Sequence, residues 1–222
     1  MELRRITITN RSSATRVIEL TSYAEAVLAP PAADAAHPAF GNLFVQTEFV
    51  GKSSALLCTR RPRSAEEKPP WLAHLMVGEI EKMGEISCET DRARFVGRGG
   101  NLASPAAMQG TAPLSNTDGS VLDPIVSLRR TVTLSPHETV IVDLVLGVTE
   151  SREAALAQME KYQSCRMAER AFDLAWTHSQ VILRQLDATE GEAQLYGCMA
   201  GALIYADSAR RANPGVLGAN RR

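Results

Sequence analysis

The chain has 222 residues, with 24 basic and 25 acidic side chains and a formal net charge of -1 at pH 7. This balance disfavours a nucleic-acid partner, because nucleic-acid-binding proteins usually concentrate basic residues on one face. No apolar run reaches the roughly 18–20 residues that span a bilayer, so we expect no direct membrane insertion by this segment. The length predicts one large domain, or one domain with an appendage.

Alternating apolar and polar residues predict a succession of short strands through the first two thirds of the chain. Polar or Gly/Pro-rich turns separate them, such as Pro30-Pro31 and Gly97–Gly100, and no interleaved helix is expected. Many short strands with such connections predict antiparallel sheets packed as a β-sandwich. The expected strands are Arg4–Thr9, Arg16–Val27, Leu43–Phe49, Ala55–Thr59, Trp71–Val77, Glu85–Thr90, Val126–Leu134 and Val140–Val148.

The period of the apolar pattern changes from strand-like to helical near residue 150. Ser151 is placed to cap a first helix, and an apolar stripe over Phe172–Leu186 predicts a second. A third helix opens with the capping box Thr189–Glu192. We therefore expect residues 1–150 to form an antiparallel β-sandwich domain, and residues 151–222 to form a helical linker of about three α-helices.

The densest group of charged side chains lies in the segment Glu89–Arg98. Glu89 and Asp91 stand at i, i+2, so an extended backbone would project both carboxylates to one side, about 6–7 Å apart. That separation is near the lower limit used by inverting glycosidases. The alternative, which we favour because backbone rise alone does not place carboxyl groups, is that both acids pair with neighbouring guanidinium groups and pin a loop. These neighbours are Arg92, Arg94 and Arg98.

Other chemistry-bearing residues are scattered. Trp71 follows Pro69-Pro70 and is either a sugar-stacking platform or, as we favour, the start of a core strand. His178 is expected on a helix surface, and no nucleophile–base arrangement is recognisable. We therefore assign no catalytic residue, no metal site and no cofactor. The cysteines lack metal-ligand spacing and are expected to be reduced thiols; they are Cys58, Cys88, Cys165 and Cys198.

Six segments, each weak alone, together resemble one family. The combination is similar to the sugar-phosphorylase-like region of cyclic β-1,2-glucan synthases, related to the cellobiose and chitobiose phosphorylases of glycoside hydrolase family 94, formerly glycosyltransferase family 36. The segments are Arg4–Asn10 (RRITITN), Ile18–Glu25 (IELTSYAE), His37–Val45 (HPAFGNLFV), Glu89–Arg98 (ETDRARFVGR), Leu122–Ile125 (LDPI) and Phe172–His178 (FDLAWTH).

The resemblance implies an order of parts. An N-terminal supersandwich-like β-sandwich and a helical linker would precede a catalytic (α/α)6 barrel, which holds the general acid and the phosphate-binding residues of such phosphorylases. The barrel would begin beyond the basic end Ala219–Arg222, so we expect a fragment that is not catalytic by itself. The parent would be a transferase of carbohydrate metabolism at the inner membrane, with this segment on the cytoplasmic side.

Three functions remain open. The first is a carbohydrate-binding-like domain that supports glucan binding or chain-length control, and the second is a structural scaffold and dimerisation module for the barrel. The third is a self-sufficient glycosidase that uses the two acids at 89 and 91. The expected partners are a β-glucan oligosaccharide or the parent's barrel, with a homodimer as a further option. The contact candidates are Glu89, Asp91, Arg92, Arg94, Phe95, Arg98 and Trp71.

Overall fold

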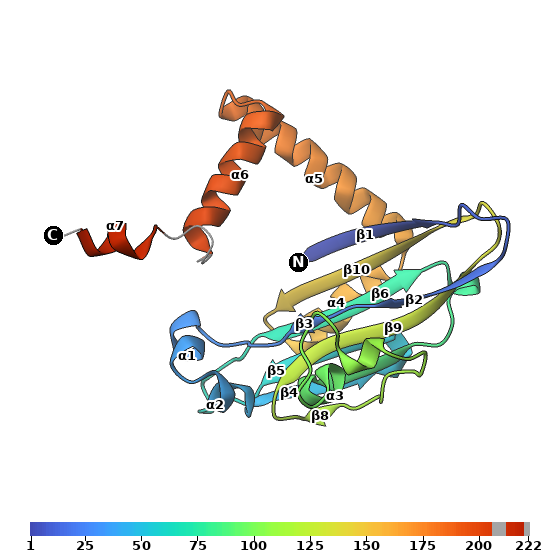
Figure 1. Cartoon of the computed structure of the whole chain (residues 1–222), viewed down its shortest axis with the longest axis horizontal. Coiled ribbons are helices and arrows are strands. Elements are labelled where there is room, and N and C mark those ends of the chain that lie inside the picture. The colour runs from blue at the N-terminus through green and yellow to red at the C-terminus, as the bar shows by residue number, and fades with distance from the viewer. Residues whose placement is uncertain (206–211, 220–222) are drawn as a thin grey trace. The chain divides into compact units, whose positions relative to one another are not determined.

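The computed structural model describes residues 1–205 and 212–219 and divides into two compact units, Met1–Glu169 and Arg170–Arg222. The first unit contains two antiparallel sheets (Figure 1). Residues 220–222 of the expected basic end lie outside the described residues.

The two sheets confirm the predicted antiparallel sandwich. The six-stranded sheet has the order β1 (Glu2–Thr9), β10 (Thr139–Thr149), β6 (Trp71–Gly78), β5 (Ala55–Arg60), β4 (Val45–Val50) and β8 (Gly119–Ser120). In the smaller sheet β9 (Pro124–Leu134) pairs with β2 (Arg16–Thr21), β3 (Ala24–Glu25) and β7 (Ser87–Asp91). The single strand expected over 16–27 is interrupted at Ser22 and Tyr23, which separate β2 from β3.

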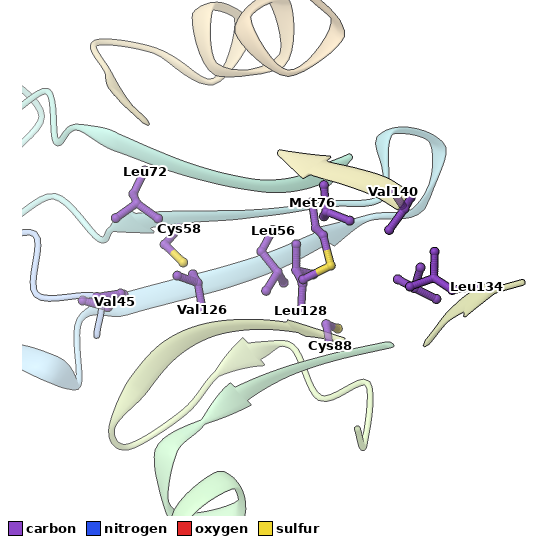
Figure 2. Close-up of a cluster of buried hydrophobic side chains, with 13 residues drawn as sticks. Val45, Leu56, Cys58, Leu72, Met76, Cys88, Val126, Leu128, Leu134 and Val140 are labelled. Atoms are coloured by element: carbon purple, nitrogen blue, oxygen red, sulfur yellow. The ribbon is translucent and has the colours of Figure 1, made fainter. Parts of the chain in front are cut away.

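The core fills the space between the sheets with alternate residues of each strand. Leu56 of β5 and Met76 of β6 come from the larger sheet, and Leu128 of β9 comes from the smaller one, all three buried (Figure 2). Such a side chain contributes roughly 1.5–3 kcal/mol when it leaves water. The alternation that predicted the strands therefore also identifies the face of each strand that builds the core.

Helix α4 (Arg152–Tyr162) packs on the outer face of the larger sheet. Ser151 caps it, as predicted, and accepts a hydrogen bond from the backbone N–H of Ala154. Its buried residues are Ala155, Met159 and Tyr162, and it contacts β6 and β10. The sandwich unit therefore extends to Glu169 and includes this helix, whereas the expected division at residue 150 falls before it.

Three short helices lie within the strand-rich part, so the expectation of no interleaved helices was wrong. They are α1 (Pro31–Ala36), α2 (Pro38–Asn42) and α3 (Arg92–Val96). Proline stands at the start of α1 and α2, where its fixed φ and missing N–H suit the first helical turn. In the sequence Pro30-Pro31 indicated only a turn, and Pro38 carried no helix prediction.

The second unit is helical. It contains most of α5 (Cys165–Gln185), together with α6 (Glu190–Ile204) and α7 (Pro214–Ala219). Thr189 forms the predicted capping box with Glu192 at the start of α6, whereas α7 adds a helix beyond the three expected. Within the described ranges, no helix combines the length and the apolar character needed to cross a membrane.

Candidate functional site

The charged segment identified in the sequence forms the end of β7 and the helix α3. The side chain of Asp91 accepts a hydrogen bond of 2.9 Å from the backbone N–H of Ala93 and so begins the helix. Gly97 ends it with φ +83, and a Cβ there would lie 2.6 Å from the Cβ of Ala106. Both the conformation and the close approach therefore require glycine at this position.

Glu89 has a structural role. Glu89 is buried, with only 3% of its surface exposed. One carboxylate oxygen accepts hydrogen bonds of 3.0 Å from the backbone N–H groups of Thr90 and Asp91, and the other accepts one from the Ser115 hydroxyl. The register of β7 against β9 also shifts between Glu89 and Asp91, so the regular alternation assumed in the sequence does not apply. Glu89 therefore holds the loop through backbone and hydroxyl partners and not through the neighbouring arginines that were expected, of which only Arg94 lies near an acid of the pair, Asp91, at 3.8 Å.

Arg92 joins parts of the chain that are far apart in sequence. Its Nε lies 3.1 Å from a carboxylate oxygen of Glu25, and its Nη1 lies 3.5 Å from one of Asp123. The hydroxyl of Tyr23 donates to Glu25 (3.0 Å), and the amide of Asn42 donates to Asp123 (3.0 Å). Hydrogen bonds to Tyr23, which has the larger effect, and to Glu25 raise the pKa of Arg92. The side chain therefore keeps its positive charge at every relevant pH. We call these five residues the Arg92 network.

A cavity of about 540 Å³ lies beside this network. The rings of Tyr23 and Phe95 line it, with centroids 5.0 Å apart and planes at 40°. Thr21, Ser104 and Gln109 add polar groups to the lining. Ring faces combined with a few polar groups are typical of small-molecule sites. We call this hollow the Tyr23 cavity.

Arg129 holds the loop that forms one wall of the Tyr23 cavity. It is 4% exposed, and its Nε donates to the Thr21 hydroxyl at 2.8 Å. Its Nη1 and Nη2 donate to the carbonyl oxygens of Ala112 (2.8 Å) and Ala107 (2.6 Å), on either side of Gln109. Sequence reasoning missed this residue because an arginine in a strand pattern, here followed by Arg130, carries no signal of its partners.

The other predicted contact residues are distributed unevenly. Arg94 donates to the Thr117 hydroxyl at 3.2 Å and, with Asp91, lines a second cavity of about 370 Å³. Arg98 is exposed beyond α3 and forms no ion pair with any described residue. Trp71 is half-buried at the start of β6 in the other sheet, where it pairs with Thr59 and Thr149. The structure thus gathers the segment around α3 but does not bring Trp71 to it.

The network also contains residues that were not among the predicted contacts. Glu25, Asn42 and Asp123 each lie in a different one of the segments that carry the family resemblance. The signal that could have found them was the set of segments taken together, since nothing local in any one of them indicates the others.

The arrangement suits binding of hydroxyl-rich ligands. Guanidinium and carboxylate groups can bond to sugar hydroxyls, and ring faces pack on sugar C–H groups. No group of three or more His, Cys, Asp or Glu side chains among the described residues could hold a metal ion. Burial raises the pKa of the Cys58 thiol to about 12 and that of Cys88 to about 11, so neither is a ready nucleophile.

Two comparisons with known proteins identify the family of this chain. Residues 1–165 match the family model of the glycosyl hydrolase 94 supersandwich domain. Over 212 residues the chain is 36% identical to the cyclic beta-(1,2)-glucan synthase NdvB of Rhizobium meliloti (strain 1021). That alignment covers 96% of this chain but 8% of the relative, so the chain spans a small part of that protein's length.

Proposed function

Because this chain belongs to the glycosyl hydrolase 94 supersandwich family, we propose that it is a non-catalytic, carbohydrate-binding domain of a cyclic β-1,2-glucan synthase-like protein. Its task is to hold the glucan and so to support chain-length control in a parent that acts as a transferase. The observation that carries the proposal is the Arg92 network beside the Tyr23 cavity.

The site offers two kinds of contact to a glucan. The half-buried ring of Tyr23 presents an apolar surface, while its hydroxyl is already oriented by Glu25. Arg94 and Asp91 line the second cavity and supply donors and acceptors there. Because each charged group is held by a partner, little side-chain entropy is lost when a sugar binds.

Removal of the central cation or of the ring is expected to weaken glucan binding. Arg92→Ala should lower the affinity for linear β-1,2-glucan about 10-fold or more, because a hydrogen bond to a charged group is worth about 1.5–3 kcal/mol. Tyr23→Ala should lower it about 3–10-fold through loss of the ring surface. Isothermal titration of the 222-residue chain with linear and cyclic β-1,2-glucans measures both effects.

The matched control is Arg16→Ala, which removes an exposed guanidinium from β2 without touching the network. Its affinity should equal that of the unmodified chain. If Arg92→Ala and Tyr23→Ala bind both glucans as tightly as the control, the site is not where glucan binds.

A second candidate function is a scaffold for the parent's catalytic barrel. The helices of the second unit expose large apolar side chains: Trp176 is 64% exposed, Leu186 70% and Leu203 87%. Exposed apolar patches of this kind usually mark surfaces covered by another protein. A second copy of the chain could cover them as well. If the folded chain binds neither glucan in the titration, that result would favour this scaffold function over carbohydrate binding.

We further propose that the segment lies on the cytoplasmic side of the inner membrane. All four cysteines are free, and free thiols are typical of a reducing compartment. Cys198 is exposed, so its chemical labelling can show on which side of the membrane the segment lies. A maleimide that cannot cross membranes should label Cys198 of the parent protein only after the cells are opened, with Cys198→Ser as the control. Labelling of Cys198 in intact cells would place the segment outside.

A further inference from the structure

A second buried arginine, on β5 of the larger sheet, lacks the partners that Arg129 has. Arg60 ends β5 and is 4% exposed. It stands on the same strand face as Leu56 and Cys58, which belong to the core between the sheets. Its Nε and Nη2 atoms are buried and donate to no acceptor among the described residues. Its Cζ lies 5.6 Å from the ring centroid of Phe44.

A buried guanidinium in this situation points to an anion. Charged groups are almost never fully buried unless they are paired, and an uncompensated buried charge is strongly unfavourable. The ring face of Phe44 compensates part of that cost but accepts none of the in-plane N–H bonds. An anion close to the guanidinium would compensate the remaining charge.

Arg60 lines a cavity of about 550 Å³ that can hold such an anion. Two further cations, Arg63 and Lys68, line the same cavity, against one carboxylate, that of Glu67. The Glu67 carboxylate accepts a hydrogen bond from the backbone N–H of Arg63, so it is engaged in holding the loop. Apolar groups, including Pro69, form the remaining wall.

We propose that this cavity binds the phosphate group of a small organic molecule. The positive charge of Arg60 lies at the base of the cavity and attracts the phosphate group, and Arg63 and Lys68 bind the phosphate oxygens from the exposed loop. The excess of two positive charges in the lining matches a phosphate dianion better than a single carboxylate. The cavity is much larger than a phosphate group, and its apolar wall suits the organic part of a phosphate monoester.

The test measures whether phosphate stabilises the folded chain through Arg60. Inorganic phosphate, glucose 6-phosphate, glucose and the dicarboxylate succinate serve as probes in thermal unfolding of the 222-residue chain. At about 100 times its Kd, glucose 6-phosphate should raise Tm by about 5–10 °C, inorganic phosphate should raise it less, and glucose should leave it unchanged. Arg60→Met should abolish both shifts, and without ligand its Tm should not be lower, because the substitution removes an unpaired buried charge.

Arg61→Met is the matched control. The Arg61 guanidinium also lies over Phe44, at 5.3 Å, but it is exposed and does not line the cavity. This variant should keep both phosphate-dependent shifts. Lys68→Ala, on the exposed loop, should fold normally and weaken glucose 6-phosphate binding about 3-fold or more, which tests the site even if Arg60→Met fails to fold.

The outcomes separate cleanly. Shifts that persist in Arg60→Met or are unchanged in Lys68→Ala place phosphate elsewhere and overturn the proposal. A shift with succinate but none with either phosphate assigns the cavity to carboxylates and likewise overturns it. A shift with inorganic phosphate that equals the one with glucose 6-phosphate keeps the phosphate site but removes the organic part of the ligand.

Discussion

Arg129→Met is expected to lower the free energy of unfolding by about 3–5 kcal/mol. Truncation of a buried, fully bonded charge of this kind leaves acceptors without their donors. In this chain the stranded groups are the carbonyl oxygens of Ala107 and Ala112, the Thr21 hydroxyl and the Glu19 carboxylate, which lies 3.3 Å from the Arg129 Nε. Urea unfolding followed by circular dichroism measures the change in free energy.

The same substitution should loosen the wall of the Tyr23 cavity. Backbone amides over residues 106–112 should exchange with deuterium at least 10-fold faster, whereas those of β6 should follow the global change in stability. Arg129→Lys keeps the charge but loses the planar fork. Its free energy of unfolding should therefore lie between those of the unmodified chain and Arg129→Met. If Arg129→Met costs less than about 1 kcal/mol, the bonds to Ala107 and Ala112 do not hold the loop.

Arg129 also shows which part of the fold was readable from the sequence. It lies within the expected strand Val126–Leu134, and that strand is present as β9. The alternation of apolar residues is a local pattern, so it located the strands and their core faces. The bonds of Arg129 reach partners 17, 22 and 108 residues away, and no local pattern encodes such distances.

The helices show the same contrast between features set by neighbouring residues and features set by distant ones. The caps at Ser151 and Thr189 were predicted correctly because a cap involves residues only a few positions apart. The helices α1 and α2 were missed because proline is compatible with both a turn and a first helical turn. Only the packing of the surrounding chain decides between the two.

The candidate site was predicted in the same partial way. The density of charge at Glu89–Arg98 located α3, yet the partners of Arg92 were assumed to be its sequence neighbours. In the structure they are Glu25 and Asp123, brought together by the pairing of β3 and β7 with the same strand, β9. Tertiary pairing, which local spacing does not determine, therefore built the network.

A buried polar link between the sheets leads to the second large effect. His74 of β6 lies with its Nδ1 3.1 Å from the carbonyl oxygen of Val145 and its Nε2 2.7 Å from the Ser22 hydroxyl. A carbonyl can only accept, so Nδ1 carries the proton and Nε2 accepts from the Ser22 O–H. The hydroxyl oxygen in turn accepts the backbone N–H of Leu128 at 3.0 Å. Neutral histidine satisfies every partner.

Protonation of His74 should therefore destabilise the fold below about pH 6.5. Burial lowers its pKa to about 4, whereas the unfolded chain has the ordinary value of 6.5. The unfolded state thus binds the proton more readily, so the stabilisation is complete above pH 6.5 and falls as the pH drops toward 4. The loss should be about 3 kcal/mol over that window.

The measurement compares urea unfolding of the unmodified chain and of His74→Gln at several pH values from 7 to 4. From pH 7 to pH 4 the unmodified chain should lose about 3 kcal/mol of unfolding free energy relative to His74→Gln. The reason is that glutamine can donate to Val145 and accept from Ser22 without titrating. His178→Gln, at an exposed site on α5, should keep the pH dependence of the unmodified chain. A difference that stays constant across the window would mean that His74 is already protonated in the fold or is solvated there, and the assignment of a neutral inter-sheet link would then fail.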